Sequence, residues 1–123
     1  MDLKTFDAYC QSLPAAKMVV QWGGSHVWKV GDKVFALCGP WGKTREDKSW
    51  NIVFKVSDLA FQILTEQKGI ISAPYLGRFK WVLIEETNAM SSEDIKAYIE
   101  AAHKIVAQKL TRAKRKELGL EST

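Results

Sequence analysis

The sequence predicts an α+β fold, a two-layer sandwich in which helices cover one face of a mostly antiparallel five-stranded sheet. Three observations support this class: segments with alternating apolar residues, a tight turn between two of them, and amphipathic segments that begin with capping residues. The expected order is α-β-β-β-β-α-β-α. At this length we expect one domain over residues 1–118, followed by a frayed tail over residues 119–123.

The clearest strand signal is a hairpin over residues 26–38, with Gly31 and Asp32 at its tip. A two-residue loop that begins with glycine is typical of a type II′ turn, which sets the pairing of the two strands. The aromatic side of this ribbon is expected to be buried. The register predicts three facing pairs on that side: Val30 with Lys33, Trp28 with Phe35, and His26 with Leu37.

Three further strands are expected over residues 17–22, 50–56 and 79–86. In the second of these, alternation places Trp50 on the same buried side as the apolar residues that follow it. Residues 70–78 are expected to be irregular because Pro74 and Gly77 interrupt them.

Helices are expected where a capping residue precedes an apolar stripe, from Asp2 to about residue 13, from Ser57 to Gly69, and from Ser91 to about residue 110. One or two more turns, capped by Thr111, are expected after the last of them. The stripe of the second helix is made of four residues: Leu59, Ala60, Ile63 and Leu64.

The positive charge of the chain is concentrated at its C-terminal end. Residues 1–103 hold 12 basic and 12 acidic residues, whereas residues 104–123 hold six basic and two acidic residues. Such a cluster could follow the phosphates of a nucleic acid, or it could be a solvated helix end whose cations suit the negative pole of the helix dipole. The candidate nucleic-acid-binding residues are Lys109, Arg112, Lys114, Arg115 and Lys116.

A second candidate group could contact a ligand or a protein partner. Trp41 lies in a polar loop over residues 39–49, as a lid over the sheet edge or as an exposed contact residue. Tyr75, Arg78 and Lys80 surround an irregular turn, which suits an anion pocket or ordinary turn chemistry. Trp81 follows this turn, and its strand position favours the core.

No catalytic or metal-binding constellation is visible in the sequence. The two histidines and two cysteines lack the spacing of a zinc site, and no glycine-rich phosphate loop occurs. His26 has no carboxylate placed by sequence to orient it, and Cys10 and Cys38 are expected to be buried free thiols. We therefore expect no enzymatic activity, no cofactor and no metal. With no membrane-spanning run and no signal peptide, we expect a cytoplasmic monomer.

Four segments resemble the MmcQ/YjbR family of small bacterial proteins: QWGGSHVWKVGDKVFAL, FKVSDLAFQIL, APYLGRFKWVLI and IVAQKLTRAKRKELGL. The resemblance implies a sheet-and-helix fold like that of the frataxin homologue CyaY, also called a double-wing fold. It also implies DNA binding, the usual label of the family. Many members have Asn and His in the third segment where this chain has Gly77 and Lys80, so a role of that polar pair does not carry over.

The sequence thus favours a non-enzymatic module that binds DNA weakly, without sequence specificity and in a salt-dependent manner, through its basic C-terminal helix end. The alternative is a protein-interaction or small-ligand module without affinity for nucleic acid. Exposed tryptophans near a pocket or an apolar patch would favour this alternative.

Overall fold

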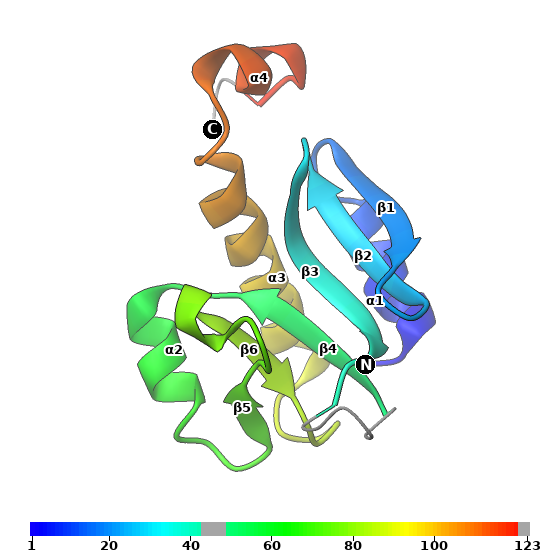
Figure 1. The fold of residues 1–123 in the computed structure, drawn as a ribbon, viewed down its shortest axis with the longest axis vertical. Helices are drawn as coiled ribbons and strands as arrows, with labels where there is room; N and C mark the ends of the chain where they lie inside the picture. Colours follow the sequence, from blue (N-terminus) through cyan, green and yellow to red (C-terminus); the bar gives the residue numbers. More distant parts are fainter. Residues whose placement is uncertain (43–48, 121–123) are drawn as a thin grey trace.

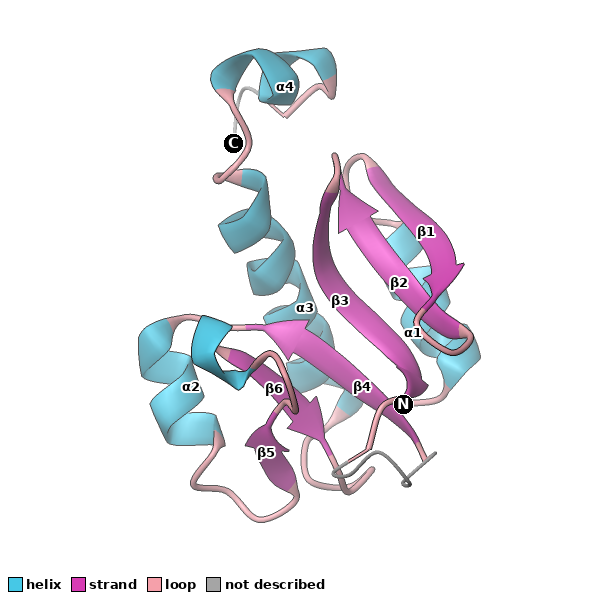
Figure 2. Cartoon of the chain, viewed as in Figure 1, coloured by secondary structure: helices cyan, strands magenta, loops and turns pink. Residues whose placement is uncertain are grey.

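A computed structural model describes residues 1–42 and 49–120 of the chain. Within these ranges, a six-stranded antiparallel sheet packs against helices in an α+β arrangement (Figure 1, Figure 2). The helices are α1 (Leu3–Gln11), α2 (Asp58–Leu64), α3 (Ser92–Ala107) and α4 (Arg112–Glu117), with the 3₁₀ turn η1 (Gly77–Phe79). The strands are β1 (Ala16–Gln21), β2 (Ser25–Val30), β3 (Lys33–Pro40), β4 (Trp50–Lys55), β5 (Ile70–Ser72) and β6 (Trp81–Ile84). The predicted fold class is confirmed, with one strand more than expected.

The strand order across the sheet is β1-β2-β3-β4-β6-β5, and every neighbouring pair is antiparallel. The extra strand is β5, which occupies residues predicted to be irregular. Its three residues pair with β6, from Ile70 opposite Ile84 to Ser72 opposite Val82. The prediction failed because Pro74 and Gly77 interrupt the chain only after this short strand has ended.

The hairpin between β2 and β3 forms with the expected turn but with a shifted register. Gly31 has a φ of +64°, as the first position of a type II′ turn requires. Val30 faces Lys33 as predicted, but a β-bulge follows between Lys29 and Trp28. The predicted pairs of Trp28 with Phe35 and of His26 with Leu37 are therefore wrong. The observed pairs past the bulge are Trp28 with Ala36, Val27 with Leu37, and His26 with Cys38.

The bulge has a packing consequence. A bulge sets two residues of one strand against one residue of its partner. Consecutive residues Phe35 and Ala36 both join the core on the helix side of the sheet, where Trp28 also lies. The bulge thus adds Ala36 to the buried face that already holds the rings of Trp28 and Phe35.

The helices begin where the sequence predicts. Side-chain oxygens of the four predicted caps accept hydrogen bonds from backbone N–H groups three residues ahead. The caps are Asp2, Ser57, Ser91 and Thr111.

Helix α2 departs from its predicted apolar stripe. It lies at the β6–β5 edge of the sheet and buries Leu64, whereas Leu59 and Ile63 are exposed. The edge position leaves too little neighbouring structure to cover the whole stripe.

Two apolar clusters fill the two sides of the sheet. The larger cluster lies between the sheet and the helices, and it includes Phe6, Phe54 and Ile99. The smaller cluster, on the opposite side, contains Val27, Leu37, Val53, Ala73, Trp81 and Leu83, with Trp41 and Leu76 packed against it. The expected core position of Trp50 is wrong, because this residue is 48% exposed at the start of β4.

The chain stays packed to the end of the described residues. Leu120 is 1% exposed and joins the larger cluster, so packing extends beyond the predicted domain end at residue 118. Residues 121–123 of the predicted frayed tail lie outside the described residues. No helix among the described residues is long and apolar enough to cross a membrane.

Candidate nucleic-acid interface

A depression of about 430 Å³ lies where β3 begins and β4 ends, between η1 and the C-terminal end of α3. Its lining is strongly basic, with a single acidic residue among the ten. The lining residues are Lys33, Val34, Lys55, Asp58, Arg78, Phe79, Lys80, Trp81, Val106 and Lys109.

Strand pairing explains why the sheet opens at this point. β3 and β4 pair only from Ala36 opposite Phe54 to Pro40 opposite Trp50. The beginning of β3, with Lys33, lies beyond this pairing, while the last residue of β4 turns to β6. Figure 1 shows the two strand ends diverging beside the C-terminal part of α3.

The η1 turn places two cations at the depression. The Cζ atom of Arg78 lies 4.7 Å from the ring centroid of Phe79, and Nζ of Lys80 lies 4.9 Å from that of Phe61. Lys80 has a φ of +64°, and its N–H donates to the carbonyl of Gly77. A lysine in this left-handed conformation costs on the order of 1 kcal/mol, which the surrounding turn must offset.

Gly77, at the start of η1, lies against Ser72 of β5. A Cβ atom at this position would lie 1.9 Å from Oγ of Ser72, a distance that real Cβ contacts do not show. A side chain at this position would therefore require the Ser72 side chain to move.

Lys55 is the most constrained cation of the depression. Its Nζ donates to the carbonyl of Phe79. Burial lowers the pKa of Lys55 from its ordinary value of 10.5, with further lowering by Lys109 and Lys80 and an opposing effect of Asp58. The free protein thus holds like charges close together, an arrangement that a bound anion would stabilise.

A second depression of about 450 Å³ continues the first across the hairpin tip. It is lined by Asp32, Lys33, Lys109, Leu110, Thr111 and Lys114, so Lys33 and Lys109 belong to both. We call the joined surface the basic groove. It holds six basic residues against the two acids Asp32 and Asp58, and the basic ones are Lys33, Lys55, Arg78, Lys80, Lys109 and Lys114.

The structure divides the predicted C-terminal cluster. Lys109 and Lys114 line the basic groove, whereas Arg112 and Lys116 are exposed on α4 outside it. Arg115 turns to α3, where its Nη1 donates to the carbonyls of Gln108 at 3.0 Å and Leu110 at 3.1 Å. The groove thus gathers part of the predicted cluster together with Arg78 and Lys80 of the second predicted group.

The predicted aromatic contacts take different positions. Trp41 is half-buried as a lid on the smaller cluster, with its Nε1 donating to the carbonyl of Pro74 at 3.1 Å. Trp22 and Tyr75 pack edge-to-face on Trp41 at 5.6 and 6.3 Å between ring centroids. Tyr75 is 73% exposed, whereas Trp81 is only 8% exposed and forms a wall of the groove.

Sequence reasoning missed Lys33, Lys55 and Phe79 as groove residues. All three lie in the part of the chain whose charges balance, so the charge distribution along the sequence gives no sign of them. The ends of strands that neighbour each other in the sheet could have indicated Lys33 and Lys55. Their approach to Lys109, however, depends on how α3 packs.

His26 has an orienting carboxylate that sequence reasoning missed. Its Nδ1 lies 2.7 Å from Oδ2 of Asp7, whose Oδ1 accepts a hydrogen bond from Nε1 of Trp28 at 2.9 Å. The partner comes from α1, so no local spacing indicates it. Among the hydrogen bonds of the described residues, none joins His26 to a hydroxyl or a thiol.

The two cysteines are free and buried, as expected. Burial and the nearby carboxylate of Asp7 raise the pKa of both thiols, that of Cys38 to about 12. Neither thiol is therefore a nucleophile at neutral pH. The described residues contain no group of three or more His, Cys, Asp or Glu residues that could hold a metal ion.

Comparison with known proteins identifies the family. The YjbR family model matches residues 11–105, whereas no curated protein matches the chain. The fold resembles the crystal structure of Deinococcus radiodurans DR2400, with its DUF419 domain, at 23% identity and a TM-score of 0.77, covering 94% of this chain and 86% of that one. A Pseudomonas syringae crystal structure is similar at 20% identity and a TM-score of 0.70, covering 86% and 99%. This chain belongs to the YjbR family.

Proposed function

We propose that this protein is a non-enzymatic module that binds nucleic acid through phosphate contacts along the basic groove. The basic groove itself is the supporting observation, since it places six cations from five parts of the chain on one continuous surface. Lysine and arginine side chains on such a surface neutralise phosphates and release counterions, which favours binding at low salt.

Two features of the groove suit this ligand. The cationic neighbours of Lys55 add to the lowering of its pKa by burial in the free protein. A phosphate bound beside Lys55 would counteract this lowering. Phe79 is 51% exposed in the lining, with the guanidinium of Arg78 over its ring, so it offers a stacking surface for an unpaired base.

The groove favours binding without base specificity. Five of its six cations are lysines, which contact phosphate as point charges and do not read base edges as a planar guanidinium does. We expect weak affinity with a steep salt dependence, up to a slope of about −5 for six neutralised phosphates of a duplex.

The test is fluorescence anisotropy of labelled duplex and single-stranded DNA over a salt series. The variant Lys33→Gln/Lys109→Gln removes the two cations shared by both depressions, and we expect it to lower affinity and to make the duplex slope shallower by about 2. The single variants Lys17→Gln and Lys96→Gln, and their combination, are the matched controls, because these lysines line neither depression.

Absence of binding to both DNA forms at low salt would overturn the proposal. An equal loss in the control double variant would also overturn it, since net charge alone would then explain the binding. Glutamine substitution is preferable to a chain that ends at Leu110, because such a chain would lack the buried Leu120.

A further inference from the structure

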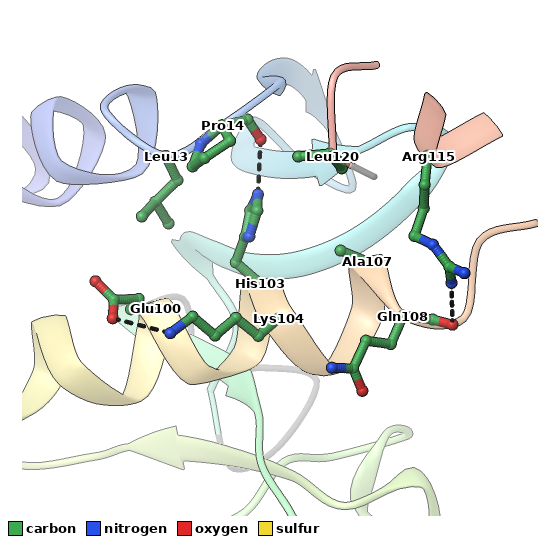
Figure 3. A pocket seen from close by; sticks show the side chains of 9 residues that line it. All are labelled: Leu13, Pro14, Glu100, His103, Lys104, Ala107, Gln108, Arg115 and Leu120. Carbon is green, nitrogen blue, oxygen red and sulfur yellow. Dashed lines mark hydrogen bonds and ion pairs between the residues drawn. The ribbon is translucent and has the colours of Figure 1, made fainter. Parts of the chain in front are cut away.

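We propose that a second pocket, which shares no residue with the basic groove, binds a small amphipathic monocarboxylate such as a medium-chain fatty acid. This pocket lies between the turn after α1, the C-terminal half of α3, and α4 (Figure 3). We call it the α4 pocket, and its lining is Leu13, Pro14, Glu100, His103, Lys104, Ala107, Gln108, Arg115 and Leu120.

The size and floor of the α4 pocket suit the apolar part of such a ligand. Its volume is about 500 Å³, within the range of small-molecule sites of roughly 300–1,000 Å³. Leu13, Ala107 and Leu120 are all buried, and the Pro14 ring lies beside them. An alkyl chain placed here would exchange water for these side chains.

The walls of the α4 pocket are fixed by hydrogen bonds between elements. Nε2 of His103 donates to the carbonyl of Pro14 at 2.7 Å, which holds the turn after α1 on α3. The His103 ring is 5% exposed and packs edge-to-face on Phe35 at 5.2 Å between centroids. The pocket is therefore formed before a ligand arrives, which lowers the entropic cost of binding.

Arg115 provides the recognition group for the carboxylate. Its Nη1 donates to the carbonyls of Gln108 and Leu110, so the guanidinium is held at the pocket wall (Figure 3). No hydrogen bond among the described residues engages its Nε and Nη2, which leaves donors in the fork geometry that matches a carboxylate.

The charge of the lining selects a monoanion. Lys104 and Arg115 contribute two positive charges, and Glu100 contributes one negative charge. Nζ of Lys104 lies 3.5 Å from Oε1 of Glu100, and both side chains are more than half exposed. Such an exposed pair is weak, so the lysine can turn toward a bound carboxylate at little cost.

The test is an NMR titration of the full chain with octanoate, and with octanol as the uncharged analogue. We expect octanoate to shift the signals of Ala107, Gln108 and Leu120, and octanol to bind at least about tenfold more weakly, because it lacks the charge-assisted hydrogen bonds. Equal binding of the two compounds would overturn the proposal. Octanoate shifts confined to Lys33 and Lys109 of the basic groove would do the same.

The variant Arg115→Lys keeps the charge but removes the guanidinium fork, and we expect it to weaken octanoate binding by about tenfold. The matched control is Lys116→Arg, an exchange of the same two residue types at the next position of α4, which is exposed. A similar loss in this control would contradict the role of Arg115.

If the Arg115 variant does not fold, the NMR titration of the unaltered protein with octanoate and octanol tests the role of Arg115. The Nε–H signal of Arg115 should then move with octanoate and not with octanol, and a signal that stays in place would reject the proposal. The Lys33→Gln/Lys109→Gln variant should retain octanoate binding, so failure of the nucleic-acid proposal and failure of this one are separate results.

Discussion

Lys114 and Arg115 are neighbours on α4, yet they serve two unlike regions of the molecule. Lys114 lines the basic groove, where six cations surround a surface open to solvent. Arg115 lines the α4 pocket, which has a buried apolar floor and uses Nη1 of this residue to hold α4 on α3. The comparison shows that a run of basic residues is not one surface, since the helix directs successive side chains to different neighbours.

The two regions also differ in how they are built. The basic groove follows from strand ends that separate, and its cations come from β3, β4, the turn around η1, the end of α3 and α4. The α4 pocket follows from helix packing, and its floor includes the buried Leu120 near the end of the described chain. Damage to α4 packing should therefore affect the pocket first and the groove only through Lys114.

The largest expected effect is the loss of the leucine that holds this end of the chain. Because Leu120 is 1% exposed, Leu120→Ala should lower the free energy of unfolding by about 2–5 kcal/mol and abolish octanoate binding. Urea denaturation measures the first effect and the NMR titration the second. Leu59→Ala is the matched control, since Leu59 is exposed on α2 and should change stability by less than about 0.5 kcal/mol. A loss below about 1 kcal/mol for Leu120→Ala would contradict this packing.

A second change tests the turn that places Arg78 in the basic groove. Gly77→Ala should cost up to about 1 kcal/mol of stability, because the added Cβ would lie 1.9 Å from Oγ of the exposed Ser72, whose side chain must turn away. Chemical denaturation of the single and double variants forms a mutant cycle with Ser72→Ala. We expect the second substitution to recover most of the loss, and strictly additive effects would contradict the contact.

Substitutions of Arg115 and Lys114 on α4 test the difference between the α4 pocket and the basic groove directly. Arg115→Gln removes two charge-assisted hydrogen bonds to the end of α3 and should lower stability by about 1–2 kcal/mol. Lys114→Gln should leave stability within about 0.5 kcal/mol while it weakens DNA binding, because the Lys114 ion pair with Glu117 is exposed. Thermal denaturation and anisotropy on both variants measure the contrast. Equal changes in stability and in DNA binding for the two variants would contradict the assignment of Lys114 and Arg115 to different regions.

The smallest expected effect concerns Lys55 and pH. Since its pKa is lowered on folding, the folded protein releases this proton at a lower pH than the unfolded chain does. The loss of folding stability caused by the Lys55 charge is fully present at neutral pH. It disappears as pH rises through the lowered pKa toward 10.5. The stability of the unaltered protein relative to Lys55→Gln should therefore increase with pH over that window.

Urea denaturation of the two proteins at several pH values measures this change. An NMR titration should also show the pKa of Lys55 rising when DNA is bound. If the pKa of Lys55 stays unchanged with saturating DNA, Lys55 does not contact the phosphates.

Local interactions made much of the fold predictable. The caps Asp2, Ser57, Ser91 and Thr111 act within three residues of themselves, so the sequence is sufficient to place the helix starts. The turn at Gly31 likewise depends on residues that are neighbours in the chain. An added Cβ there would also lie 3.0 Å from Leu110, a contact across the fold that no local pattern indicates.

The failures concern positions where two elements meet. The bulge beside Trp28 depends on packing Phe35 and Ala36 under the helices, and the exposure of Leu59 depends on the edge position of α2. Alternation alone placed Trp50 in the core, although the strand end at which it lies is open. Periodicity predicts which residues share a face, but not whether another element covers that face.

The sequence by itself determined the α+β class, the helix starts, the tight hairpin turn and the excess of positive charge near the C-terminus, because each depends on residues close together in the chain. Only the tertiary structure decided that Lys33 and Lys55 meet Lys109, that Arg115 turns away from them, and that Asp7 reaches His26. These contacts join elements far apart in sequence, and their distances follow from how α1, α3 and α4 pack on the twisted sheet.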